Sequence, residues 1–127
     1  MKVLVIGGSG IISSACTNLA IHKAIKLFHL NRGHATAIRP VPVEVVQLIA
    51  DVRDYKSEST VLADHEFDVV VDWISFVPEH LEHNLNLLKG KAKQFVFISS
   101  ASAYQTPPLK LPITDETPMD NPYWEYS

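Results

Sequence analysis

Met1-Lys-Val-Leu-Val-Ile-Gly-Gly-Ser-Gly-Ile-Ile-Ser-Ser14, the beginning of the chain, joins an apolar run to a glycine cluster and then to a helical pattern. The run Lys2–Ile6 is rich in β-branched residues, which is typical of a buried parallel strand. After the glycines, apolar residues recur at helical spacing and predict one inward helix face. Its members are Ile12, Cys16, Leu19 and Ala20. The stretch therefore predicts a strand, a tight turn and a helix.

A strand, a glycine turn and a helix in this order are the setting that a phosphate-binding loop requires. Gly7 permits the tight turn, and Gly10 lets the backbone approach a pyrophosphate without a Cβ in the way. The N–H groups of the first helical turn then face the anion, with the positive end of the helix dipole behind them. Position 13, where close packing favours a third glycine, holds Ser13. The alternative is a glycine-rich turn that binds nothing.

The composition is that of an ordinary globular domain, since 46% of the 127 residues are hydrophobic and 20% are charged. The formal net charge is −3 and no run of Lys or Arg is present, which disfavours a nucleic-acid or membrane surface. The single cysteine, Cys16, cannot form an internal disulfide and is predicted to lie in the core. Because the first strand starts at residue 2 and no apolar run approaches a membrane span, we expect a cytoplasmic protein.

Further along the chain, apolar runs alternate with helical patterns. Strands are predicted over residues 25–30, 43–49, 67–75 and 94–100, and helices over residues 11–23, 55–63 and 78–89. Asp54 is expected to cap the second helix, and Pro78 is expected to be the first residue of the third. Prolines recur between Pro107 and Pro122 and predict a loop there.

This alternation predicts an α/β fold, a doubly wound parallel sheet with strand order 3-2-1-4-5. In such a sheet a ligand lies across the carboxyl ends of the strands where the winding reverses, which is here between strands 1 and 4. Polar or conformationally special residues follow each strand at that edge. They are Gly7–Ser13, Asn31-Arg32, Asp51-Val52, Trp73-Ile74-Ser75 and Ser99-Ser100. We therefore expect the binding site at this edge.

Five motifs occur in register along nearly the whole chain. They are Gly7-x-x-Gly10-x-x-Ser13, Leu30-Asn31-Arg32-Gly33, Asp51-Val52-Arg53-Asp54, Ile98-Ser99-Ser100-Ala101-Ser102-Ala103-Tyr104 and Asn121-Pro-Tyr-Trp-Glu-Tyr-Ser127. Their order and spacing resemble the extended short-chain dehydrogenase/reductase family, in its NAD-dependent epimerase/dehydratase branch. The resemblance implies a Rossmann domain that binds NAD or NADP in an oxidoreductase or epimerase.

The resemblance also implies which residues bind the cofactor. The pyrophosphate is expected against Gly7, Gly8, Ser9, Gly10, Ile11 and Ile12; the adenosine ribose against Asn31 and Arg32; the adenine against Asp51 and Val52; and the nicotinamide side against Trp73, Ile74, Ser75 and Ser99. Many family members with an acidic residue near the ribose prefer NAD. The guanidinium of Arg32 suits a 2′-phosphate, so NADP is favoured over NAD.

The family's catalytic group is Ser or Thr, Tyr and Lys, and the resemblance assigns the first two roles to Ser100 and Tyr126. A phenol is a poor base at neutral pH because its unperturbed pKa is about 10, and a neighbouring ammonium favours the phenolate. The lysine would fall beyond Ser127. We therefore expect an incomplete Rossmann domain, truncated before the sixth strand and lacking the substrate-binding domain, that is inactive by itself.

Other interpretations of single residues stay open. His80 and His83 lie three apart on a predicted helix, but no metal site is expected because neighbouring glutamates fit a solvated face equally well. Trp73 fits plain core packing, and Ser99 and Ser100 fit the polar end of a strand.

The function has alternatives as well. A non-catalytic nucleotide-sensing or RNA-binding module on the same fold is one of them, although the net charge of −3 disfavours RNA. The small-molecule substrate is open, with a nucleotide sugar as one candidate. An unpaired edge at the fifth strand, or the helix over residues 78–89, predicts self-association into a homo-oligomer.

Overall fold

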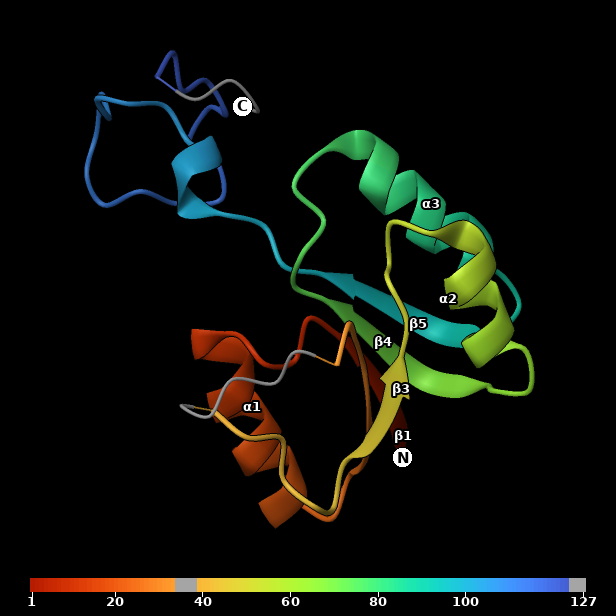
Figure 1. Ribbon diagram of the computed structural model, residues 1–127. Coiled ribbons are helices and arrows are strands. Elements are labelled where there is room, and N and C mark those ends of the chain that lie inside the picture. The colour runs from red at the N-terminus through yellow and green to blue at the C-terminus, as the bar shows by residue number, and fades with distance from the viewer. Residues whose placement is uncertain (34–38, 124–127) are drawn as a thin grey trace.

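Helices cover both faces of a five-stranded parallel sheet (Figure 1) in the computed structural model, which describes residues 1–33 and 39–123. The strand order is β3-β2-β1-β4-β5, which confirms the predicted order. The strands are β1 Lys2–Ile6, β2 Lys26–Asn31, β3 Val46–Ile49, β4 Phe67–Asp72 and β5 Ala92–Phe97. The helices are α1 Ile11–His22, α2 Tyr55–Leu62, α3 Pro78–Leu88 and the short 3₁₀ helix η1 Ala101–Ala103.

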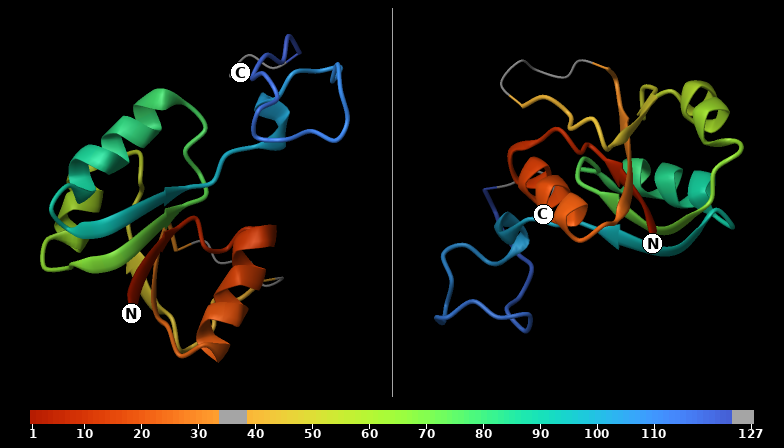
Figure 2. Two further views of the ribbon diagram at one scale, coloured as in Figure 1. Left: turned by 180° about the vertical axis from the view of Figure 1, so that it is seen from behind. Right: turned by 90° about the horizontal axis from the view of Figure 1, so that it is seen from below.

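Side chains of β1 alternate between two hydrophobic clusters because successive residues of a strand point to opposite faces. Leu4 and Ile6 lie in the larger cluster, under α2 and α3. Val3 and Val5 lie in the smaller one, under α1, and Figure 2 shows α1 on the face opposite the other two helices. The glycine turn between β1 and α1 therefore lies where the chain passes to the α1 face.

The predicted starts of α2 and α3 are confirmed. The Asp54 side chain caps α2 by accepting from the N–H groups of Lys56 and Ser57 at 3.1 and 3.4 Å. Pro78 occupies the first turn of α3, where its missing N–H needs no partner. Gly90 follows α3 with a φ of 78°, a conformation that favours glycine.

The predicted inward face of α1 is wrong for three of its four members, and Ala20 alone of the four packs against the smaller hydrophobic cluster. Ile12 is 66% exposed and Leu19 58% exposed, while Ser13 and Thr17 are buried. Cys16 is exposed as well, so the prediction that it lies in the core is wrong. Small hydroxyl side chains let the helix come close to the sheet, and hydrogen bonds to nearby acceptors make their burial inexpensive.

Several strands are shorter than predicted because side chains and turns end them. Residues 43–45 form a turn in which the N–H of Val45 donates to the carbonyl of Pro42, so β3 starts later. β4 ends at Asp72, whose carboxylate accepts from the next two free N–H groups, those of Ile74 and Ser75. β5 covers residues 92–97 rather than 94–100.

The segment after β5 leads away from the sheet (Figures 1 and 2). It forms η1 and a loop that closes through a hydrogen bond from the N–H of Gln105 to the carbonyl of Pro118, at 2.7 Å. β5 consequently lies at one edge of the described sheet. No described helix has the length and apolar character needed to cross a membrane.

Candidate functional site

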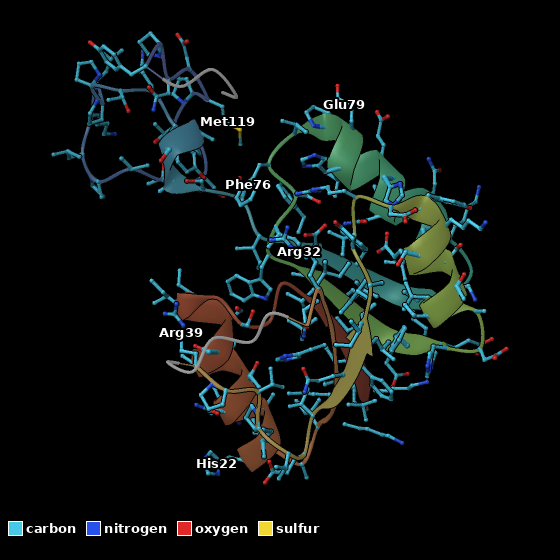
Figure 3. All side chains as sticks on the ribbon, viewed as in Figure 1. His22, Arg32, Arg39, Phe76, Glu79 and Met119 are labelled. Carbon is cyan, nitrogen blue, oxygen red and sulfur yellow. The ribbon has the colours of Figure 1, made fainter. Side chains whose placement is uncertain are left out.

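Two clefts open at the carboxyl edge of the sheet, on either side of Phe76. The first, called the glycine cleft, has a volume of about 460 Å³ and is lined by Gly7, Ser9, Gly10, Leu30, Asn31, Arg32, Ala50, Asp51, Val52, Arg53, Ile74 and Phe76. The second, called the apolar cleft, has about 850 Å³ and is lined by Ile12, Trp73, Ser75, Phe76, Val77, Pro78, His80, Leu81, Phe97, Ile98, Ser99, Ser100, Ser102 and Ala103. Figure 3 labels Phe76, which lines both, and Arg32 at the same edge.

The glycine turn is built so that side chains are excluded from it. Gly7 has a φ of 81°, and a Cβ there would overlap the side chain of Ile74. A Cβ on Gly8 would lie 2.5 Å from the His29 ring. Gly10 begins α1 without a side-chain cap. The first N–H groups of the helix are therefore offered to the cleft with the dipole behind them, as anion binding requires.

Asn31 and Arg32 follow β2 at the rim of the glycine cleft. The Asn31 side-chain oxygen accepts from the N–H of Gly33 at 2.8 Å, while its buried Nδ2 has no hydrogen-bond partner in the described structure. Arg32 is exposed and lines the same cleft. The end of β2 thus offers a free amide donor and a guanidinium.

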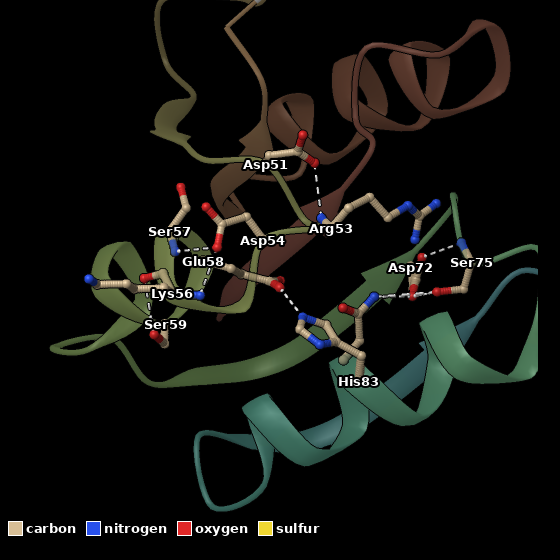
Figure 4. Close-up of polar contacts among 11 residues, drawn as sticks. Asp51, Arg53, Asp54, Lys56, Ser57, Glu58, Ser59, Asp72, Ser75 and His83 are labelled. Carbon is tan, nitrogen blue, oxygen red and sulfur yellow. Dashed lines mark hydrogen bonds and ion pairs between the residues drawn. The ribbon is translucent and has the colours of Figure 1, made fainter.

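Asp51, Val52 and Arg53 follow β3 on the other side of this cleft. The Asp51 carboxylate accepts from the N–H of Arg53 at 2.9 Å, which Figure 4 shows, and Val52 is buried. The Arg53 guanidinium reaches across and donates to the carbonyl of Ile74 at 2.9 Å. Arg53 belongs to a predicted motif, but the sequence offers no sign of this bridge because its two ends lie 21 residues apart.

Asp72 holds the turn that follows β4, a role that was not predicted from the sequence. Its buried carboxylate accepts from the N–H groups of Ile74 and Ser75 at 2.9 and 3.0 Å. It also accepts from the Ser75 hydroxyl at 2.5 Å and from Asn84 at 2.7 Å (Figure 4). These bonds fix the Trp73–Ser75 turn, whose residues line both clefts. An Asp directly after a valine run was the available signal.

Between α2 and α3, Glu58 and His83 form a close pair, with Oε2 and Nε2 2.7 Å apart (Figure 4). Burial raises the pKa of the Glu58 carboxyl, and the hydrogen bond and charge of His83 oppose that rise. His83 is thereby engaged with a carboxylate rather than paired with His80. Among residues 1–33 and 39–123, no group of His, Cys, Asp and Glu side chains has the arrangement of a metal site.

Known proteins resemble the chain over nearly its whole length, although no protein-family model matches it. It is 34% identical to UDP-glucose 4-epimerase of Lactobacillus helveticus across 98% of this chain and 43% of that protein. The crystal structure of UDP-glucose 4-epimerase from Bifidobacterium longum, in complex with NAD+ and UDP, matches with a TM-score of 0.76 and 27% identity, over 97% of this chain and 44% of that one. These matches confirm the resemblance to the extended short-chain dehydrogenase/reductase family, in its epimerase/dehydratase branch.

A further structure shares the fold of this family. The UDP-Glc/GlcNAc 4-epimerase of Campylobacter jejuni matches with a TM-score of 0.79 at 15% identity, over 94% of this chain and 43% of that one. The chain thus spans less than half the length of these relatives.

The residues that the family resemblance assigns to the cofactor are divided between the clefts. Those for the adenosine half line the glycine cleft, as do Gly7, Ser9 and Gly10. Ile74, expected on the nicotinamide side, lines the glycine cleft as well. Ile12, Trp73, Ser75 and Ser99 line the apolar cleft. Gly8 lines a third cleft of about 340 Å³ beside His29, and Ile11 is 74% exposed. Trp73 also packs against the smaller hydrophobic cluster, which agrees with core packing, while its role in binding the cofactor stays a prediction.

The catalytic residues expected of the family are placed only in part. Ser100 lines the apolar cleft, beyond the end of β5, and its hydroxyl accepts from the N–H of Ser102 at 3.1 Å as the cap of η1. Tyr126 lies outside the described residues. Of this pair, Ser100 alone can be placed relative to the clefts.

Proposed function

We propose that the chain is the dinucleotide-binding part of an oxidoreductase of the epimerase, dehydratase or reductase kind. The glycine turn carries this proposal. Gly7 and Gly8 have no room for a Cβ. Gly10, which begins α1, lines the glycine cleft, and no side chain caps the helix there. Such a cradle fits a pyrophosphate, whose charge the backbone N–H groups and the helix dipole stabilise.

The two halves of the cofactor would lie in different clefts, on either side of the pyrophosphate at the glycine turn. The adenosine would occupy the glycine cleft, with Asp51 and Val52 beside the adenine and Asn31 and Arg32 beside the ribose. The nicotinamide would lie towards Trp73 in the apolar cleft. When bound, it supplies hydride transfer to or from a substrate carbon.

Ser100 is proposed to hydrogen-bond the substrate hydroxyl or carbonyl in the apolar cleft, and Tyr126 is proposed to exchange a proton with the same oxygen. The substrate is proposed to be a small molecule with such a group. A nucleotide sugar is favoured because the Bifidobacterium longum relative was solved with UDP and the chain shares 27% identity with it.

NADP is the proposed cofactor, with NAD as the alternative. No carboxylate follows β2 directly, and the exposed Arg32 guanidinium there suits a 2′-phosphate. The Bifidobacterium longum relative was solved with NAD+, so the proposed preference of this chain for NADP depends on Arg32 alone.

Calorimetric titration with NADP+ and with NAD+ tests the proposal. The chain should bind both, with NADP+ the tighter, and Gly8→Ala should abolish binding because the new methyl group meets the His29 ring. Gly90→Asn is the matched control, since a Cβ at Gly90 meets nothing within 4 Å and Asn tolerates its positive φ. No heat with either dinucleotide would remove the proposal.

A further inference from the structure

His29 is a buried histidine beside the smaller hydrophobic cluster, whose four fully buried members are aliphatic. It lies in the middle of β2, paired with Val5 of β1 and Gln47 of β3, and is 1% exposed. Its side chain faces α1, as do those of Leu27 and Val5 in the smaller hydrophobic cluster. A polar ring in such a place must have hydrogen-bond partners or lose stability.

The hydrogen bonds of Thr17 determine which nitrogen of His29 carries the proton. The Thr17 hydroxyl donates its one hydrogen to the carbonyl of Ser13 at 2.9 Å. It must therefore accept from Nε2 of His29, which lies 3.0 Å away. His29 is then a neutral ring with a bare Nδ1, and burial lowers its pKa to about 4.

The same chain of contacts continues to the glycine turn. The Ser13 hydroxyl donates to the carbonyl of Gly7 at 2.9 Å. The His29 ring also lies directly beneath Gly8, so closely that a Cβ on Gly8 would be 2.5 Å from its Cε1. His29 thus contacts one glycine of the turn directly and is linked to the other through Thr17 and Ser13.

We propose that His29 is a positioning residue that, through Thr17 and Ser13, holds the Gly7-Gly8 turn in the conformation that receives the pyrophosphate. The proposal rests on the proposed dinucleotide binding. Ser13 occupies the position where close packing favours glycine, and its hydroxyl supplies a tether that glycine would lack. Removing the Thr17 hydroxyl leaves the His29 Nε2–H without a buried acceptor, so the His29 ring and the glycine turn shift together.

Substitutions of Thr17 test this proposal on the 127-residue chain. Thr17→Val keeps the shape of the side chain and removes the hydroxyl, and it should weaken dinucleotide binding by roughly three- to tenfold. Thr17→Ser retains the hydroxyl and should restore most of the affinity. Thr60→Val is the matched control, because Thr60 makes the same hydrogen bond to the carbonyl four residues earlier, on α2 and away from the turn.

Affinity is measured by calorimetry well below the melting temperature, together with the amide ¹H–¹⁵N shifts of Gly7 and Gly8. Positioning predicts shifted Gly7 and Gly8 amides in Thr17→Val and not in Thr60→Val. If Thr17→Val melts at a lower temperature but keeps its affinity and both amide shifts, the chain of contacts is only structural and the proposal is overturned.

A measurement on the unsubstituted protein keeps the proposal testable if Thr17→Val does not fold. Long-range ¹H–¹⁵N spectra at pH 7 should show His29 protonated at Nε2 and bare at Nδ1, and the opposite tautomer would overturn the proposal. The two proposals also fail separately. Absence of dinucleotide binding by the unsubstituted chain would remove the proposed function, whereas the Gly7 and Gly8 amide shifts without ligand would still decide the role of His29.

Discussion

The Arg53 guanidinium donates a hydrogen bond to the carbonyl oxygen of Ile74 at 2.9 Å and so joins the residues that follow β3 to those that follow β4. The side chain of Ile74 fills the space where a Cβ on Gly7 would lie. The bridge therefore forms part of the wall of the glycine cleft, next to the glycine turn.

Arg53→Gln should weaken dinucleotide binding by roughly threefold, because the hydrogen bond to the Ile74 carbonyl is lost while the Ile74 side chain stays packed against Gly7. Calorimetry measures this change. Lys93→Gln is the control, since Lys93 pairs with Asp68 at the surface and lines neither cleft. Equal affinities for Arg53→Gln and the unsubstituted chain would show that the bridge does not shape the cleft.

Asp72→Asn should lower the free energy of unfolding by about 2–4 kcal/mol, because an amide nitrogen replaces an oxygen that now accepts from buried donors. Urea denaturation measures this. Asp68→Asn, on the same strand, should shift the denaturation midpoint far less because Asp68 pairs with Lys93 at the surface. Similar midpoints for the two variants would contradict the role given to Asp72.

The stability of the chain should depend on pH through His29. Its pKa of about 4 in the folded state lies below the unfolded value of 6.5, so the unfolded state binds more protons between these values. The stability is complete above pH 6.5 and is lost as the pH falls towards 4. Between pH 7 and pH 5 the loss is on the order of 2 kcal/mol.

Comparison with His29→Leu isolates this effect. Glu58 keeps its raised pKa in both proteins, and its opposite contribution, which favours the fold at low pH, therefore cancels. Arg39, which lines the small cleft beside His29, is also common to both. Urea denaturation at pH 5 and pH 7 should show a smaller loss for His29→Leu, and equal losses would contradict a buried neutral His29.

Arg32→Ala should weaken NADP+ binding by roughly tenfold or more and change NAD+ binding little, because a charge-assisted hydrogen bond to the 2′-phosphate is lost. Parallel titrations with the two cofactors measure the ratio. Arg53→Gln is the comparison, since a loss there should affect both cofactors alike. A constant NADP+/NAD+ ratio in Arg32→Ala would contradict the preference for NADP.

The order of the strands could be predicted because apolar runs and helical patterns are local properties of the sequence. The glycine turn could be predicted too, since Gly7 and Gly10 lie between a clear strand and a clear helix. The inward face of α1 could not be predicted, because its buried residues are polar and are satisfied by hydrogen bonds. The Ser13 hydroxyl donates to the carbonyl of Gly7, and the Thr17 hydroxyl is hydrogen-bonded to the carbonyl of Ser13 and to His29. Periodicity of apolar residues does not record such contacts.

The candidate site shows the same division. Residues at strand ends could be placed on one edge from topology alone. Arg53 and Asp72 could not be given roles, because their partners Ile74 and Asn84 lie 21 and 12 residues away and depend on how the strands and α3 come together.

A crystal structure of the chain with NADP+ bound would test the pyrophosphate cradle itself. We expect the two phosphates at the start of α1, hydrogen-bonded to N–H groups between Gly8 and Ile12, with the adenosine in the glycine cleft beside Asp51 and the 2′-phosphate at Arg32. A pyrophosphate bound elsewhere, such as in the cleft beside His29 and Arg39, or a glycine turn that rearranges to cover the start of α1, would contradict the proposed binding site.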